Sequence, residues 1–247
     1  MSHFSVAVLS TSPDEVESLL EPYYESTDNS DYLELIPAEE SMDEIRAQYA
    51  QEKQPDETLE HFISRYYGYT YNEELDECSY ICNPNAKWDW WMIGGRWEDM
   101  LVLKPNCVGY RTEGRLVVNG GHCDQALLRD VDLSMDQEAY DKAARFWEIV
   151  VEGDSVRDDE NPDDFHAYRK EYYLTQFGDK HTYAADCAAF STWALVTPDG
   201  EWRQKGEMGW FGMSDATCES RADFAAQLEA ALKENPDLWI TVVDCHI

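Results

Sequence analysis

The chain has 247 residues, of which 43% are hydrophobic and 13% aromatic, enough to form one large domain or two small ones. Its 51 Asp and Glu against 19 Lys and Arg give a formal net charge of -32. This charge disfavours direct binding of nucleic acid, which requires cations to neutralise phosphates. Because no apolar run reaches the roughly 20 residues of a membrane helix and residues 1–20 lack a signal-peptide layout, we expect a soluble, cytoplasmic protein.

The N-terminal third predicts short strands and acidic helices. Alternating side chains predict a strand at 3–10, and Ser12, Pro13 and Glu15 then form a helix-capping signal for a helix that ends near Leu20. The next elements expected are a short strand at 32–36 and helices at 41–51 and 58–67.

The rest of the chain alternates between strand-rich and helical segments. Tryptophan, glycine and valine with many turn signals predict antiparallel strands between Tyr80 and Val118. The remaining predicted elements are a helix capped by Ser134, a helix at 163–177, a hairpin at 191–204, a helix at 221–233 and a strand at 239–244. We therefore expect an α+β fold with an antiparallel or mixed sheet, ferredoxin-like being one candidate, and helices packed on one side. The chain would form a single domain, 1–247, with 38–78 as an acidic helical insertion.

Negative charge is concentrated near the N-terminus. Between Asp14 and Glu60 there are sixteen carboxylates against two cations, Arg46 and Lys53. Such a run is typical of solvated helix faces. It is also what a surface needs to imitate nucleic-acid phosphates and occupy a basic groove on a partner. The residues assigned to this acidic face are Glu39, Glu40, Asp43, Glu44, Asp56, Glu57 and Glu60.

The segment 83–97 is the most unusual in composition. It has four tryptophans in ten residues, together with Asp89, Arg96 and a Gly94-Gly95 pair. These side chains could form an aromatic pocket for a planar ligand, or they could be a core of large rings with an internal Asp89–Arg96 ion pair. The pocket hypothesis assigns Trp88, Asp89, Trp90, Arg96, Trp97, Trp210, Asp244 and His246.

Catalytic and metal chemistry have weaker signals. Cys245 and His246 are neighbours in the last predicted strand and therefore point to opposite faces, whereas Asp244 and His246 share one. Zinc ligation by Cys78, Cys82, His122 and Cys123 would need an atypical pair of adjacent ligands. We assign no catalytic residue, no metal and no cofactor, and the seven scattered cysteines do not suggest a disulfide framework.

The segments Asn83–Trp90 and Ile93–Trp97 and the closing residues 242–247 resemble uncharacterised proteins of phages and bacteria that carry a Lys-Trp-Asp-Trp and Ile-Gly-Gly-Arg-Trp segment. The Thr197–Gly200 turn and the glycine-rich segment 206–212 extend the resemblance to about two thirds of the chain. It implies a phage or mobile-element context, in which small acidic cytosolic proteins often antagonise host defence, and therefore the host cytoplasm.

These observations favour a non-catalytic, phage-type inhibitor of a bacterial defence system, anti-CRISPR-like or anti-restriction-like. Its partner would be a defence protein with a basic nucleic-acid-binding groove, contacted without a membrane and without direct nucleic-acid binding. The alternative is a small-ligand or nucleotide-binding protein or an enzyme that uses the Trp/Asp/Arg pocket and the C-terminal Asp and His. A virion or scaffold component is a third hypothesis.

Overall fold

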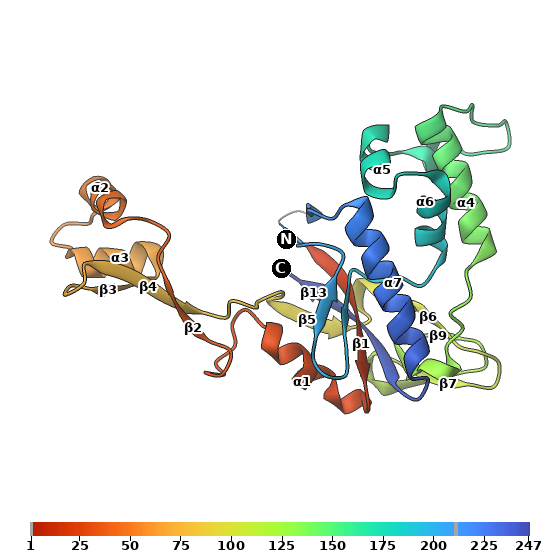
Figure 1. Cartoon of the computed structure of the whole chain (residues 1–247), viewed down its shortest axis with the longest axis horizontal. Coiled ribbons are helices and arrows are strands. Elements are labelled where there is room, and N and C mark those ends of the chain that lie inside the picture. Colours follow the sequence, from red (N-terminus) through yellow and green to blue (C-terminus); the bar gives the residue numbers. More distant parts are fainter. Residues whose placement is uncertain (1, 210–211) are drawn as a thin grey trace. The chain divides into compact units, whose positions relative to one another are not determined.

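The chain divides into two compact units. The computed structural model describes residues 2–209 and 212–247. Unit 1 comprises Met1–Leu20 and Trp88–Ile247, and unit 2 comprises Glu21–Lys87 (Figure 1). The segment 38–78, interpreted above as an acidic insertion, lies within unit 2. Within the described ranges, none of the helices has the length and hydrophobicity that a membrane crossing requires.

Unit 1 is built on an eight-stranded sheet with the order β12-β11-β1-β13-β10-β7-β8, in which β5 also pairs with β13. Its strands are β1 (His3–Ser10), β5 (Trp90–Ile93), β7 (Val108–Arg111), β8 (Arg115–Val118), β10 (Gln125–Leu127), β11 (Ala194–Val196), β12 (Trp202–Gln204) and β13 (Trp239–His246). A separate two-stranded sheet pairs β6 (Leu101–Val102) with β9 (His122–Cys123).

The pairing directions confirm the expected α+β class with a mixed sheet. β1 runs parallel to β11, and the other pairings of this sheet are antiparallel, including the predicted β11–β12 hairpin. A ferredoxin-like sheet is built from split β-α-β units, in which another strand separates the two parallel strands. β1 and β11 pair directly instead, so the strand order differs from the ferredoxin-like candidate.

Several helices of unit 1 begin at capping residues, one of which differs from the residue predicted from the sequence. They are α1 (Val16–Leu20), α4 (Gln137–Trp147), α5 (Lys170–Phe177), α6 (Lys180–Ala188) and α7 (Cys218–Glu234). The Ser12 capping box with Glu15 is present as predicted. The cap of α4, however, is Asp136 and not Ser134, because the Asp136 carboxylate accepts hydrogen bonds from the amides of Glu138 and Ala139.

The predicted helix at 163–177 is two elements, and the helix after it was not predicted. A short 3-10 helix covers Pro162–Phe165, and α5 begins only at Lys170. Gly178 then ends α5 with a positive φ of 77°, and the Asp179 side chain caps α6 by accepting from the Thr182 amide. The residue that ends α5 and the residue that caps α6 are therefore adjacent in the chain, which turns between the two helices.

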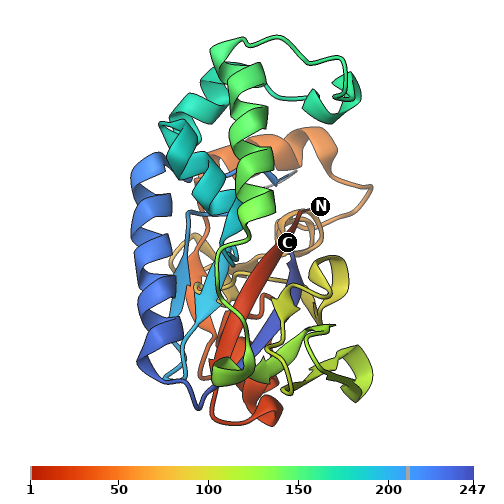
Figure 2. The ribbon, with the colours of Figure 1, turned by 90° about the vertical axis from the view of Figure 1, so that its right-hand side faces the viewer.

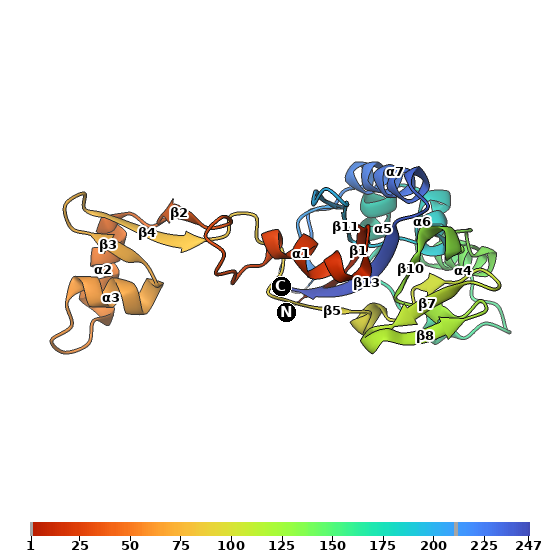
Figure 3. The same cartoon turned by 90° about the horizontal axis from the view of Figure 1, so that it is seen from below.

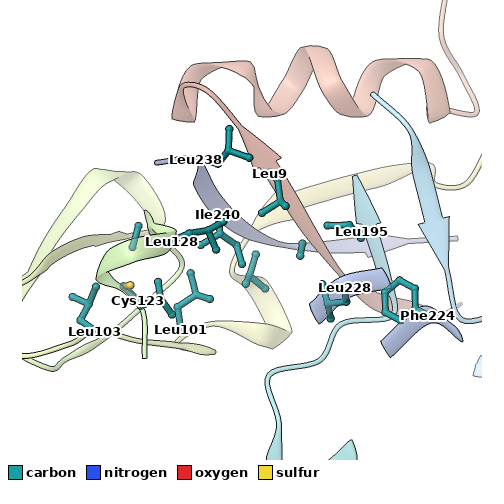
Figure 4. Close-up of a cluster of buried hydrophobic side chains, with 14 residues drawn as sticks. Leu9, Leu101, Leu103, Cys123, Leu128, Leu195, Phe224, Leu228, Leu238 and Ile240 are labelled. Carbon is teal, nitrogen blue, oxygen red and sulfur yellow. The ribbon is translucent and has the colours of Figure 1, made fainter. Parts of the chain in front are cut away.

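The core of unit 1 lies between the sheet and α7. Leu9, Leu195 and Ile240 from three strands pack with Phe224 and Leu228 of α7 (Figure 4). Figure 2 shows α7, the long blue helix, lying along these strands. The alternate residues of β1, such as Val6 and Val8, point to the opposite face and are also fully buried. Both faces of the central strands are therefore covered.

Unit 2 has its own sheet and its own core. Its elements are β2 (Glu34–Pro37), α2 (Met42–Glu52), α3 (Leu59–Tyr67), β3 (Thr70–Asn72) and β4 (Glu77–Cys82). The strands form an antiparallel sheet in the order β2-β4-β3, and α2 and α3 lie on one side of it (Figure 3). Ile45, Phe62, Ile63 and Cys78 form the buried cluster between helices and sheet.

Candidate functional site

The carboxylates of unit 2 are mostly at its surface. The segment Glu21–Lys87 contains 17 Asp and Glu against 4 Lys and Arg. The exposed acids are Glu25, Asp28, Asp31, Glu34, Glu39, Asp43, Glu44, Glu52, Asp56, Glu60, Glu73, Glu74, Asp76 and Glu77. Its two arginines offset only one of these exposed acids, because Arg46 pairs with Asp76 whereas Arg65 pairs with the buried side chain of Glu57. The outer surface of unit 2 therefore carries a large excess of negative charge.

Three of the seven residues assigned to the acidic face also hold the fold together. Glu44 closes a capping box with Ser41 at the start of α2, and these hydrogen bonds lower its pKa. The Glu40 carboxylate accepts a hydrogen bond from the Tyr69 hydroxyl at 2.8 Å. Glu57 bonds to Arg65 Nε and His61 Nδ1, and its side chain is only 2% exposed. Glu57 is thus part of the internal structure and does not lie on an exposed face.

Replacing Glu57 by glutamine is expected to weaken the acid dependence of unit 2's stability. The hydrogen bond from Arg65 is the main cause that lowers the pKa of Glu57 from 4.5 to about 2. A lowered pKa stabilises the folded state above 4.5, and the contribution is lost as the pH falls towards 2. The free energy of unfolding of the wild type, measured with urea, should therefore fall as the pH is lowered over that range. That of Glu57→Gln should fall less. Arg65→Gln should behave like Glu57→Gln, whereas profiles parallel to the wild type would contradict the assignment.

The other four assigned residues are available to a partner. Glu39, Asp43, Asp56 and Glu60 are all exposed. They lie in the loop before α2, the first turn of α2, the α2–α3 turn and the first turn of α3. Asp43 and Glu60 are acids at helix N-termini, where negative charge stabilises the helix, so the sequence places them there without cost to the fold. These four residues form the core of the candidate acidic surface.

The sheet of unit 2 has an open face with apolar side chains. Leu35 of β2 and Ile81 of β4 are direct cross-strand partners, and each is 67% exposed. The alternate β4 residue Cys78 points into the core below the helices. An exposed pair of large aliphatic residues among carboxylates is typical of a surface that a partner covers. Sequence analysis missed this pair, although strand alternation at 34–37 and 77–82 was a usable signal.

The glycine pair of the tryptophan-rich segment allows two buried carboxylates to approach the backbone. A β-carbon on Gly94 would lie 2.9 Å from Asp124 Cγ, and one on Gly95 would lie 2.5 Å from the Asp244 side chain. Both glycines have positive φ, 69° and 58°. Asp124 accepts from the amides of Asp99 and Thr112. The glycines therefore serve close packing of the loop after β5.

Two histidine–carboxylate pairs lie beside this loop. Asp244 Oδ1 bonds to His3 Nδ1 at 2.8 Å, and its Oδ2 accepts from the Arg96 amide at 3.0 Å. Asp89 Oδ1 bonds to His246 Nδ1 at 2.6 Å, and the two imidazole rings are 4.9 Å apart between centroids. Asp89 thus pairs with His246 instead of forming the alternative ion pair with Arg96. The carboxylates fix the orientation of both imidazoles.

The tryptophans do not converge on a common pocket. Trp88 is buried and donates from Nε1 to the Leu20 carbonyl, and Trp97 packs against the main core. Trp90 is 45% exposed and lies edge-on to His3, while Arg96 is exposed. Trp210 lies outside the described residues. The structure therefore brings together Asp89, Trp90, Asp244 and His246, with His3 as the residue that sequence analysis missed.

Comparison of the chain with protein-family models, with curated proteins and with solved structures found no match.

The cysteine and metal hypotheses gain no support. Cys78 and Cys82 belong to unit 2, whereas His122 and Cys123 belong to unit 1. Across residues 2–209 and 212–247, no group of three or more His, Cys, Asp or Glu side chains is arranged to hold a metal ion. Cys245 is fully buried, and this burial raises the pKa of its thiol well above 9.0, which disfavours the nucleophilic thiolate.

Proposed function

We propose that the chain acts by binding, and that unit 2 occupies the basic nucleic-acid-binding groove of a partner protein. In the phage or mobile-element context that the sequence suggests, the partner is a bacterial defence protein and the outcome is inhibition. The observation that carries this proposal is the set of exposed carboxylates on unit 2, whose two arginines are both paired with acids of the same unit.

Electrostatics supports a partner of opposite charge. Exposed charges act over about 8–10 Å at physiological salt, so many carboxylates on one small unit produce a combined field that a basic groove would attract. Nucleic acid itself would be repelled, because it offers no cations. Association would be fast and sensitive to salt, as is general for complementary charged surfaces.

The apolar pair on the open sheet face supports a protein partner. Leu35 and Ile81 would provide apolar burial that charge alone does not. A surface that served only solubility would gain nothing from exposing two adjacent aliphatic residues. The combination fits a groove that is basic at its rim and apolar at one point.

The test has two steps. Tagged protein first captures partners from a bacterial lysate, and those released by salt are purified. The affinity of each partner for its nucleic acid is then measured by fluorescence anisotropy with and without the chain. Reversal of Glu39, Asp43, Asp56 and Glu60 to lysine should weaken competition with nucleic acid by at least about tenfold. Ile81→Ser should weaken it in the same direction.

The matched control reverses four exposed acids of unit 1, Asp158, Asp159, Glu171 and Asp223, and so produces the same change in net charge. This control should compete like the wild type. Equal loss of competition in both variants would mean that net charge alone matters, and no competition by the wild-type chain with any captured partner would overturn the proposal.

A further inference from the structure

A cavity of about 600 Å³ lies in unit 1, and neither the acidic residues of unit 2 nor the tryptophan-rich segment contributes to its lining. It is bordered by α5, α6 and α7 and by the segment that precedes α4, and it is open to solvent on one side. Alanines line both helical walls, Ala185 of α6 with Ala189 directly after it, and Ala222 and Ala225 of α7. Their short side chains leave a space between the helices, and Phe190, Leu228 and Leu232 add apolar surface. Its size is that of a small-molecule site.

Arg221 places a positive charge on the wall of this cavity. Its Nε donates to Gln176 Oε1 at 3.0 Å, and its guanidinium lies 5.0 Å from the Phe177 ring centroid and 5.9 Å from that of Trp193. Across the ranges that the structure describes, no carboxylate pairs with Arg221. Its charge is therefore left for a ligand.

A second cation lies behind the same wall. Lys205 is only 6% exposed, and its Nζ contacts Ser191 Oγ at 2.8 Å and Asp186 Oδ1 at 3.4 Å, both residues of the cavity lining. Burial lowers the pKa of Lys205, Asp186 raises it, and the charge of Arg221 lowers it further. The remaining acid of the lining, Glu229, is paired with Lys233. The polar end of the cavity thus has two cations, Arg221 and Lys205, and one carboxylate, Asp186, which contacts Lys205.

We propose that this cavity binds a small monocarboxylate with an aliphatic body, the carboxylate on Arg221 and the body along the alanine-lined walls. Charge complementarity selects the head group, because a guanidinium and a carboxylate can form two parallel hydrogen bonds. The apolar walls select the body, because its burial removes hydrocarbon from water. The inference is independent of the proposed function of unit 2.

Octanoate and 1-octanol test the proposal on the full chain by isothermal titration calorimetry. They share the aliphatic body, and only octanoate has the charged head. Octanoate should bind with 1:1 stoichiometry and at least about tenfold more tightly than octanol. Arg221→Gln should abolish that preference, Arg221→Lys should restore part of it, and Ala225→Leu should weaken binding of both by narrowing the cavity.

Arg129→Gln is the control, since Arg129 is an exposed arginine that pairs with Asp237. It should bind both molecules as the wild type does. Circular dichroism would verify that each variant is folded. The proposal is overturned if octanoate does not bind, if it binds no better than octanol, or if Arg221→Gln and Ala225→Leu bind it like the wild type.

Discussion

Replacing Gly95 by alanine is expected to lower the free energy of unfolding of unit 1 by about 2–5 kcal/mol. Two costs add. A residue with a β-carbon at a φ of 58° loses about 1–2 kcal/mol. The new methyl group would also lie 2.5 Å from the buried Asp244 side chain, and overpacking of this kind costs about 1–3 kcal/mol. Urea unfolding followed by near-ultraviolet circular dichroism would measure the loss.

Gly153→Ala separates the two costs. Gly153 also has a positive φ, 87°, but a β-carbon there would meet no atom within 4 Å. This variant should therefore lose only the backbone contribution of about 1–2 kcal/mol. If Gly95→Ala were no more destabilising than Gly153→Ala, the close approach of Asp244 would not explain the glycine.

The same geometry changes the interpretation of the tryptophan-rich segment. From its composition, a Gly-Gly pair among tryptophans, an acid and an arginine was compatible with a core of large rings and also with a pocket. In the structure, the glycines allow the side chains of Asp124 and Asp244, which come later in the chain, to lie close to the backbone. Trp88 and Trp97 are packing residues. The alternative ligand-binding hypothesis therefore retains only the surface group of His3, Asp89, Trp90 and His246.

Local signals in the sequence were sufficient for individual elements. The Ser12 capping box, the β11–β12 hairpin and the strand β13 depend on residues close together in the chain, and each was predicted. The end of α5 at Phe177 was predicted, but α6 after it was missed, although Asp179 is a capping residue. The pairing of β1 with both β11 and β13 joins distant segments, so no local pattern specifies that order.

The candidate sites divide in the same way. Net charge predicted an acidic surface, but it did not reveal that the Glu57 carboxylate is paired with Arg65 and His61 and therefore not available to a partner. The cavity next to Arg221 needs α5, α6 and α7 to pack together, and alanines in separate helices carry no sign that they will face one another. Charge is additive along a chain and can be counted, whereas a cavity arises only from packing.

Replacing Phe62 by alanine is expected to remove a large part of the stability of unit 2 and leave unit 1 unaffected. Phe62 is fully buried and contacts the rings of Tyr49, Tyr66 and Tyr67, so its truncation should cost about 3–5 kcal/mol. At about 0.05–0.15 kcal/mol per residue, the segment Glu21–Lys87 has a total stability of only about 3–10 kcal/mol. Hydrogen exchange with mass spectrometry would show rapid exchange confined to that segment.

Leu75→Ala is the matched control, because Leu75 is 64% exposed and its loss should change stability by no more than about 0.5 kcal/mol. The Phe62 variant also distinguishes the two proposals. If unit 2 binds the partner and the cavity of unit 1 binds a carboxylate, Phe62→Ala should lose competition with nucleic acid and keep octanoate binding. Arg221→Gln should do the reverse. Loss of both activities in Phe62→Ala, with exchange spreading into unit 1, would mean that the two units do not fold independently.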